Sequence, residues 1–306
     1  MTERNNFFRY CLRSMRLRTL PLSLAGIVLG VFLAASSGPV NALTVVFLIL
    51  TTVCLQILSN LSNELGDSIS GTDSAASRKG MHYSLMDGRL TVDDIKKLIF
   101  GAALSSAIFG TLMIWTAFGS FFCMKSIIFF GLGIAAIWSA MHYTLGRNPY
   151  GYRGLGDIFV LIFFGFATVA GGYYICSGNC ELLPVLLPAF SIGTFSVAVL
   201  NVNNIRDMAT DAATRTTVAI RLGERKARIY QTVLIASGWA GMIAYCLIFS
   251  PSPWTWLFVL TAPLYALHLR GVWKRKEQAL DPMLPLLVMS TFAFAVLAGV
   301  GMMIQS

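Results

Sequence analysis

The sequence predicts an all-α integral membrane protein with nine transmembrane helices, and three observations support that fold class. First, 56% of the 306 residues are hydrophobic and only 12% are charged, against about 25% charged in an ordinary soluble domain. Second, nine stretches without Asp, Glu, Lys or Arg each reach the roughly 17–25 helical residues that cross a hydrocarbon core. Third, the charges fall almost entirely on one side of those stretches. This composition excludes a soluble enzyme, a nucleic-acid-binding domain and a disordered chain.

The first four predicted spans are the uncharged stretches 20–40, 41–62, 98–120 and 126–142. The first begins after Arg18, and only a short uncharged turn separates it from the second. The second runs into the polar Asn63, the third follows Lys97, and Lys125 separates the third from the fourth. Charged and polar neighbours set these ends because a charge inside hydrocarbon is costly.

The remaining predicted spans are 158–176, 182–204, 229–250, 253–269 and 282–304. Apolar residues occupy consecutive positions in all nine, whereas the strands of a membrane barrel alternate, so helices are predicted. The pattern Asn-x-x-x-Asp follows the second span at Asn63 and Asp67 and the sixth span at Asn203 and Asp207. This repetition indicates two four-helix repeats plus one further helix, all within a single membrane domain over 1–306.

The basic residues predict the orientation of the chain. With the N-terminus cytoplasmic, 22 of the 23 Lys and Arg lie on the inner side, and Lys125 is the exception. This bias follows the positive-inside rule and places the C-terminus outside. It also explains the net charge of +9 without nucleic acid. We therefore expect a multi-pass protein of the cytoplasmic (inner) membrane.

Three inner connections are the expected place of function, at 63–97, 143–157 and 205–228. Of the 14 acidic residues, 13 lie on the inner side, Glu181 being the exception. The outer connections are short and almost uncharged. No phosphate-binding motif G-x-x-x-x-G-K-[ST] occurs, so ATP-driven transport loses support. We expect an active site that faces the cytoplasm.

Two acidic clusters predict a metal or anion site at the inner membrane face. The first contains Asn63, Glu64, Asp67 and Asp73, and the second contains Asn203, Asn204, Arg206, Asp207 and Asp211. Asp207 and Asp211 are four residues apart, so on a helix they share a face and need a cation nearby. Oxygen ligands of this kind suit Mg²⁺ with bound phosphate oxygens. Solvated helix ends are the alternative interpretation, which the pairing of two matched clusters disfavours.

Basic and aromatic residues complete the candidate site. Arg206, Arg215, Lys79 and Arg78 are candidates to neutralise a diphosphate. The segment 143–157 offers Tyr143, Tyr150 and Tyr152 near a cation and Arg147 for phosphate, although a turn with interfacial tyrosines has the same pattern. Cys176 and Cys180 are neighbours at the predicted outer face, where two free thiols are favoured over a disulfide.

The motifs together resemble the UbiA-type superfamily of intramembrane prenyltransferases, and within it the members that act on 1,4-dihydroxy-2-naphthoate. The resemblance covers nearly the whole chain and rests on both acidic clusters and on three stretches: R-L-R-T-L-P-L-S at 16–23, Y-T-L-G-R-N-P-Y-G-Y-R-G-L-G-D at 143–157, and L-N-V-N-N-I-R-D at 200–207. Departures are Leu17 where the family often has Pro, Glu64 where many members have Asp, and His82 and Tyr83 in place of a basic residue.

The resemblance implies transfer of a polyprenyl group from polyprenyl diphosphate to 1,4-dihydroxy-2-naphthoate, with loss of CO₂ and diphosphate, to give demethylmenaquinol for menaquinone biosynthesis. It implies Mg²⁺ as the cofactor. The implied catalytic residues are Asp67, Asp207, Asp211 and Tyr143. The implied metal ligands are Asn63, Asp67, Asp73, Asn203, Asp207 and Asp211. The diphosphate-binding residues are Asn63, Lys79, Arg78, Arg147, Asn204, Arg206 and Arg215, and the acceptor-binding residues are Arg18, Arg153 and Tyr150.

Two alternatives remain open at this point. One is the same fold acting on another aromatic acceptor, such as a 4-hydroxybenzoate, haem or chlorophyllide-type ring. The other is a cation-coupled transporter, which is disfavoured because every predicted span lacks charged residues. The sequence does not indicate the length of the prenyl chain or the oligomeric state.

Overall fold

The computed structural model describes residues 3–70, 84–85, 87–179, 181–250 and 252–305, and all regular structure within these ranges is helical. Eight helical segments there are long and apolar enough to cross a membrane. They are Asn6–Ser37, Ala42–Ile69, Val92–Phe118, Met124–His142, Gly156–Ser177, Leu183–Arg206, Glu224–Phe249 and Glu277–Ile304. The fold is therefore an all-helical membrane bundle.

The N-terminal half contains five α-helices. They are α1 (Glu3–Ser14), α2 (Leu20–Ser37), α3 (Ala42–Ile69), α4 (Val92–Phe118) and α5 (Met124–His142), with the short 3₁₀ helix η1 (Leu17–Thr19) between α1 and α2. Side-chain caps fix two of the starts. Asn41 accepts from the amides of Leu43 and Thr44 to begin α3, and Thr91 forms a capping box with Asp94 to begin α4.

The C-terminal half is more interrupted. Its elements are η2 (Tyr150–Arg153), α6 (Gly156–Val160), η3 (Leu161–Ala167), α7 (Thr168–Ser177), α8 (Leu183–Arg206), α9 (Met208–Asp211), α10 (Val218–Leu222), α11 (Glu224–Phe249), η4 (Pro253–Thr261), α12 (Ala262–Lys274), η5 (Glu277–Leu280) and α13 (Met283–Gln305). The segments α6, η3 and α7 form one continuous span, in which η3 is a π-helix.

The observed helices differ from the predicted spans mainly at the charged end of the bundle. α3 continues beyond residue 62 to Ile69, α4 begins at Val92 instead of 98, and α11 begins at Glu224 instead of 229. The predicted spans end at the first charged residue, whereas the observed helices continue for another turn or two into the polar region. The predicted span 253–269 is helical, as η4 and α12, but it is not among the eight segments apolar enough to cross.

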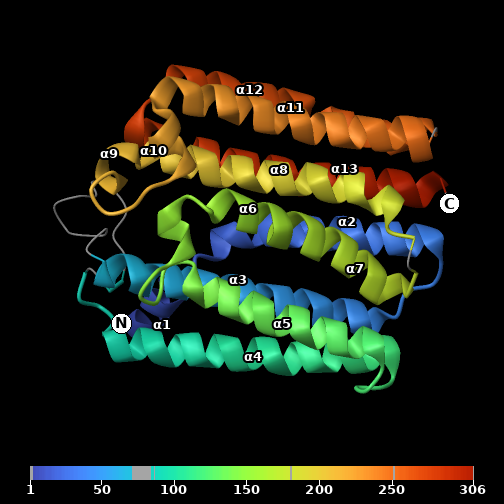
Figure 1. Cartoon of the computed structure of the whole chain (residues 1–306), viewed down its shortest axis with the longest axis horizontal. Coiled ribbons are helices and arrows are strands. Elements are labelled where there is room, and N and C mark those ends of the chain that lie inside the picture. The colour runs from blue at the N-terminus through green and yellow to red at the C-terminus, as the bar shows by residue number, and fades with distance from the viewer. Residues whose placement is uncertain (1–2, 71–83, 86, 180, 251, 306) are drawn as a thin grey trace.

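The long helices lie side by side and roughly parallel or antiparallel to one another (Figure 1). α13, the last long helix, packs along α2, the first one. α3 packs on α4, and α8 packs on α11. The N-terminus and the C-terminus lie at opposite ends of the bundle (Figure 1). α9 and α10 lie at the same end as α1, which is also where α3 and α8 end.

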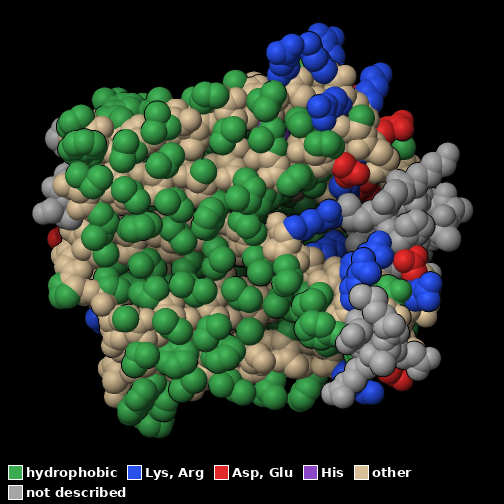
Figure 2. Space-filling view, turned by 180° about the vertical axis from the view of Figure 1, so that it is seen from behind, with side chains coloured by type: hydrophobic (Ala, Val, Ile, Leu, Met, Phe, Trp, Pro, Cys, Tyr) green, Lys and Arg blue, Asp and Glu red, His purple; other side chains and the backbone are tan. Residues whose placement is uncertain are grey.

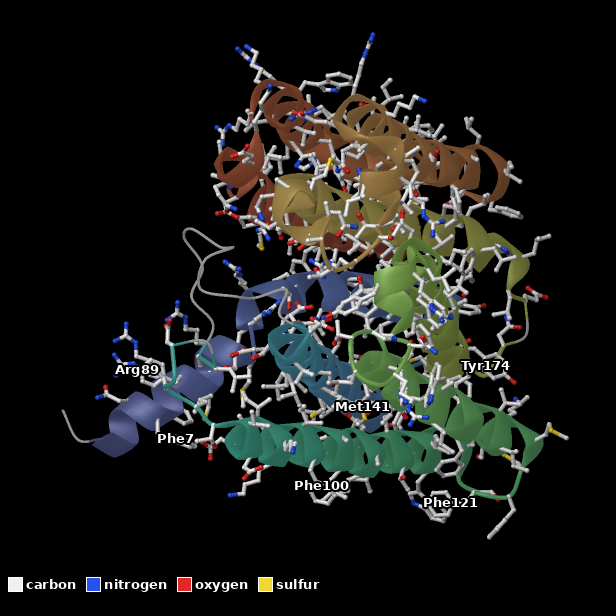
Figure 3. The ribbon with its side chains drawn as sticks, turned by 60° about the vertical axis from the view of Figure 1, so that its left-hand side comes forward. Phe7, Arg89, Phe100, Phe121, Met141 and Tyr174 are labelled. Atoms are coloured by element: carbon white, nitrogen blue, oxygen red, sulfur yellow. The ribbon has the colours of Figure 1, made fainter. Side chains whose placement is uncertain are left out.

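The distribution of side chains on the surface is typical of a membrane protein. Figure 2 shows hydrophobic side chains over most of one face, with Lys, Arg, Asp and Glu gathered at one end. Figure 3 shows Phe100 pointing outward from α4, where 70% of its surface is exposed. At the charged end Figure 3 places Phe7 and Arg89, and the Arg89 guanidinium lies 5.7 Å from the ring of Tyr10 on α1. The distribution of charge defines the polar end of the bundle.

Candidate active site

The two acidic clusters lie at the polar end of the bundle, where α3 and α8 finish. Asp67 is in the last turn of α3. Asp207 forms the non-helical joint between α8 and α9, with φ −95° and ψ 8°, and Asp211 closes the four-residue α9. All three carboxylates are buried, at 5%, 3% and 0% exposed. Buried carboxylates need partners, and the chain supplies two arginines.

Arg215 connects the first cluster with the second. Its Nη2 donates to Oδ2 of Asp211, and its Nη1 lies 3.7 Å from Oδ1 of Asp67. The Arg215 side chain is 9% exposed. Burial opposes the charge of Arg215, but the nearby Asp67 and Asp211 outweigh it and raise the pKa of its guanidinium. Residues 140 or more positions apart in sequence thus share one buried cation.

Tyr152 connects the segment 143–157 with Asp67 and Arg215. Its hydroxyl donates to Oδ1 of Asp67 at 2.8 Å, and the guanidinium carbon of Arg215 lies 6.0 Å from its ring centroid. The amide of Thr216 donates to the carbonyl of Tyr152 at 3.0 Å. Tyr152, one of the three tyrosines that the sequence offered for a place near a cation, therefore lies next to Asp67 and Arg215.

Arg206 binds Asp207 and Asn203 of the second acidic cluster. Its Nε and Nη2 donate to the two carboxylate oxygens of Asp207 at 2.8 and 2.6 Å, and Nη2 also donates to Asn203 Oδ1 at 2.8 Å. Its Nη1 donates to Asp281 at 2.7 Å. Asp281 was missed by sequence reasoning, because it lies 75 residues from Arg206 and belongs to no motif. Asn204, buried beside this group, is 5% exposed.

Tyr143 and Tyr150 lie between the acidic site and the interior. Their rings meet edge to face with centroids 5.4 Å apart. Burial raises the pKa of Tyr150 to about 12, and burial chiefly raises the pKa of Tyr143, against the lowering influence of Arg215. Gly151 fits closely here, since a Cβ at that position would lie 2.6 Å from the Tyr143 carbonyl oxygen. Both tyrosines are therefore neutral hydrogen-bonding groups at neutral pH.

The remaining predicted residues are exposed, are buried with other partners, or lie outside the described structure. Arg147 and Arg153 are exposed, and the carbonyl of Arg153 accepts from Arg221. Arg18 is exposed on η1. Glu64 is buried and accepts from the amide of Leu85 at 3.1 Å. The predicted residues Asp73, Arg78 and Lys79, the departures His82 and Tyr83, and Cys180 lie outside the described residues.

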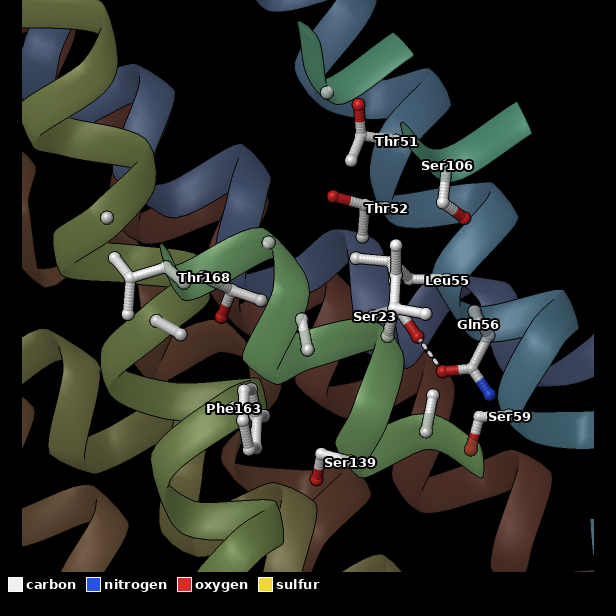
Figure 4. Close-up of a pocket in the computed structure, with 18 of the residues that line it drawn as sticks. Ser23, Thr51, Thr52, Leu55, Gln56, Ser59, Ser106, Ser139, Phe163 and Thr168 are labelled. Atoms are coloured by element: carbon white, nitrogen blue, oxygen red, sulfur yellow. Dashed lines mark hydrogen bonds between the residues drawn. The ribbon is translucent and has the colours of Figure 1, made fainter. Parts of the chain in front are cut away.

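A cavity of about 420 Å³ extends from this site into the bundle. Asn63, Tyr143 and Tyr150 line it near the acidic residues, and Asn63 Oδ1 accepts from Thr144 at 3.2 Å. Figure 4 shows polar side chains of α2 and α3 and, across from them, Phe163. The lining is mostly apolar, and aromatic residues contribute much of it: Phe129, Phe130, Phe159, Phe163 and Phe164.

The donor set at the polar end fits Mg²⁺ by its chemistry. Asp67, Asp211 and Asn63 offer carboxylate and carboxamide oxygens, which are the ligands that Mg²⁺ prefers. Within the described ranges no three His, Cys, Asp or Glu side chains form a ready metal cage. Mg²⁺ sites in proteins use one or two carboxylates and complete the shell with water and phosphate oxygens.

Comparisons with known proteins identify the family to which the chain is similar. The UbiA prenyltransferase family model matches residues 23–292. The 1,4-dihydroxy-2-naphthoate octaprenyltransferase of Haemophilus influenzae is 36% identical over 293 residues, which cover 94% of each chain. That of Escherichia coli is 37% identical over 279 residues, covering 89% of this chain and 88% of the relative.

Solved structures show the same fold. The apo structure of a UbiA homolog from Aeropyrum pernix K1 has a TM-score of 0.71 at 17% identity and covers 93% of this chain and 98% of its own. A UbiA homolog from Archaeoglobus fulgidus bound to GPP and Mg²⁺ has a TM-score of 0.60 at 17% identity, covering 94% and 99%.

Proposed function

Because this chain belongs to the UbiA prenyltransferase family, we propose that it transfers a polyprenyl group from polyprenyl diphosphate to 1,4-dihydroxy-2-naphthoate. The products are demethylmenaquinol, CO₂ and diphosphate, and the reaction belongs to menaquinone biosynthesis. The relatives from H. influenzae and E. coli carry this activity in their names. One structural observation supports the location of the chemistry: Arg215 contacts Asp67 and Asp211 from the two acidic clusters.

The polar end is the diphosphate site in this proposal. Asp67, Asp211 and Asn63 hold Mg²⁺, with Asp73, Asp207 and Asn203 as further oxygen ligands. Bound Mg²⁺ supplies positive charge that stabilises the departing diphosphate. Arg215 and Arg206 contribute fixed positive charge, and Asn204, Arg147, Arg78 and Lys79 are further candidates for the diphosphate oxygens. Since both oxygens of Asp207 accept from Arg206, we expect Arg206 to exchange this partner for phosphate on binding.

The chain's remaining contribution is to position the reactants and exclude water. The bond between the allylic carbon and the diphosphate oxygen breaks, and its electron pair leaves with the diphosphate. The ring carbon that carries the carboxylate supplies the pair for the new carbon–carbon bond. The carboxylate leaves as CO₂, and the pair of that broken bond restores the aromatic ring. Tyr143, neutral and partly buried, lines the cavity, and we assign it to the region where the allylic cation forms.

The membrane arrangement is part of the proposal. We assign the polar end to the cytoplasmic side of the inner membrane and the C-terminus to the outer side. The gathering of charge at one end (Figure 2) and the opposite placement of the termini (Figure 1) support this. Opposite termini require an odd number of crossings, so we assign the ninth crossing to η4 and α12. The two four-helix repeats stay a proposal as well.

The acceptor is tested by a comparison of substrates. The purified full-length chain in lipid nanodiscs is given Mg²⁺ and a polyprenyl diphosphate, with either 1,4-dihydroxy-2-naphthoate or 4-hydroxybenzoate. We expect equimolar CO₂ and diphosphate with the naphthoate, and neither product with the benzoate. Prenylated benzoate, without CO₂, would instead establish another acceptor on the same fold.

A further inference from the structure

A polar stripe on α3 leads from the acidic site into the cavity. Gln56, Asn60, Asn63 and Asp67 are spaced four, three and four residues apart, which places them on one face of the helix. At 1.5 Å per residue, Asn60 lies about 10 Å and Gln56 about 16 Å along the axis from Asp67. Gln56 and Asn60 line the cavity, although they are only 8% and 4% exposed. Polar side chains this far inside a membrane-spanning helix indicate a functional role.

Three neighbouring residues and a mutual hydrogen bond hold the two carboxamides in fixed orientations. Asn60 Nδ2 donates to the Met15 carbonyl at 2.8 Å and to Thr19 Oγ1 at 3.0 Å. Because a carbonyl can only accept, this contact fixes which end of the Asn60 amide is nitrogen. Asn60 Oδ1 then accepts from Gln56 Nε2 at 3.0 Å, and Gln56 Oε1 accepts from Ser23 Oγ. Thr19 and Ser23 belong to the motif R-L-R-T-L-P-L-S, and the sequence alone assigns no role to either residue.

The hydrogen-bonding capacity that remains is that of an acceptor. Gln56 Nε2 uses its two hydrogens on Asn60 and on Thr19 Oγ1, at 3.0 and 3.2 Å, and Asn60 Nδ2 has also used both of its hydrogens. Each carboxamide oxygen accepts one bond in the network and has a second lone pair. Hydroxyl groups are the natural partners of such oxygens, whereas carboxylates and diphosphates, which need donors, are not.

The two walls of the cavity therefore suit different parts of the substrates. An isoprenoid tail has no hydrogen-bonding group, so against the α3 stripe it would leave the second lone pair of each amide oxygen without a partner. The aromatic wall that includes Phe129 and Phe163 has no such cost. Figure 4 shows Ser23, Gln56 and Ser59 on one side of the cavity and Phe163 on the other.

We propose that Gln56 and Asn60 form the hydroxyl-recognition subsite for the aromatic acceptor, which rests on the proposed function. In a 1,4-dihydroxy-2-naphthoate the hydroxyl beside the carboxylate donates to that carboxylate. The remote hydroxyl at position 4 is free to donate, and its single hydrogen binds one of the two acceptor oxygens of the subsite, Gln56 Oε1 or Asn60 Oδ1. The subsite selects a diol by its remote hydroxyl and points the carboxylated edge of the ring toward the acidic site.

Two-substrate kinetics on the full-length protein test the subsite. Gln56→Met keeps the length of the side chain and removes the amide, so we expect the KM for the acceptor to rise five- to tenfold, with the KM for polyprenyl diphosphate within twofold. The matched control is Thr52→Val, because Thr52 lines the same cavity but donates to its own helix at Leu48. This control is expected to change neither KM. Equal changes in both KM values for Gln56→Met would overturn the proposal.

A second measurement separates recognition from packing, and its first arm uses the wild-type protein alone. In the wild-type protein, 1-hydroxy-2-naphthoate, which lacks the remote hydroxyl, is expected to inhibit with an affinity at least fivefold weaker than the acceptor's own. In Gln56→Met the difference should shrink to less than twofold. Equal affinities in the wild type would refute the subsite while leaving acceptor turnover, and hence the proposed function, intact. Absence of turnover in the wild type would instead refute the proposed function.

Discussion

The replacement Arg215→Met tests whether one buried cation joins the two acidic clusters. The change keeps most of the side-chain volume and removes the charge that lies against Asp67 and Asp211. Removing one partner of a buried ion pair costs about 3–5 kcal/mol, since the carboxylate stays buried without compensation. Protonation of a carboxylate limits this cost. For a group of ordinary pKa it requires about 4 kcal/mol at pH 7 and about 2 kcal/mol at pH 5.5.

We therefore expect Arg215→Met to lower the free energy of unfolding by about 3–4 kcal/mol at pH 7, and by about 2 kcal/mol at pH 5.5. The loss shrinks on acidification because protons replace the missing cation. Denaturant titration in mixed micelles at both pH values measures the difference. The matched control is Arg221→Met, which removes an exposed arginine that donates to the Arg153 carbonyl and is expected to cost less than about 0.5 kcal/mol. A loss equal at both pH values, or equal to the control's, would refute the reasoning.

Three further results are expected. Gly66→Ala should lower the free energy of unfolding by about 1–3 kcal/mol in the same titration, because a Cβ there would lie 2.6 Å from the Thr144 carbonyl oxygen; an unchanged value would contradict the close approach. Tyr152→Phe removes the hydroxyl that donates to Asp67, so diphosphate release should slow about tenfold while the fold persists by circular dichroism; full activity would exclude a role for this bond. Chelation of Mg²⁺ should stop turnover and its return should restore it, and turnover in chelator would remove Mg²⁺ from the mechanism.

The sequence was informative wherever a physical requirement repeats along the chain. Long apolar runs must cross hydrocarbon, and eight of the nine predicted spans coincide with helical segments apolar enough to cross. The helix ends differ from the predicted ones by up to seven residues, since α3 continues to Ile69 and α4 begins at Val92. Buried carboxylates need cations, and Arg215 lies against Asp67 of the first cluster and Asp211 of the second. The family resemblance is confirmed by the family model and by relatives of 36% and 37% identity.

The parts that the sequence did not predict depend on contacts between distant residues. The ion pair of Arg206 with Asp281 joins the end of α8 to the segment before α13, and no local pattern indicates it. Thr19 and Ser23 lie in a motif that was identified only by its resemblance to the family. Their partners Gln56 and Asn60 are polar residues inside a predicted span and belong to no motif. The resemblance implies Arg153 as an acceptor-binding residue; its side chain is exposed, and the role stays a prediction.

The central claim is that Asp67 and Asp211 act together in one diphosphate site, and a double-mutant cycle tests it most directly. Diphosphate release is measured for Asp67→Asn, Asp211→Asn and the double variant with Mg²⁺, polyprenyl diphosphate and 1,4-dihydroxy-2-naphthoate. Each single change should lower the rate about 100-fold or more, and the double change should be little worse than either single one, because both act on the same bound group. Unchanged release in either single variant would contradict the account.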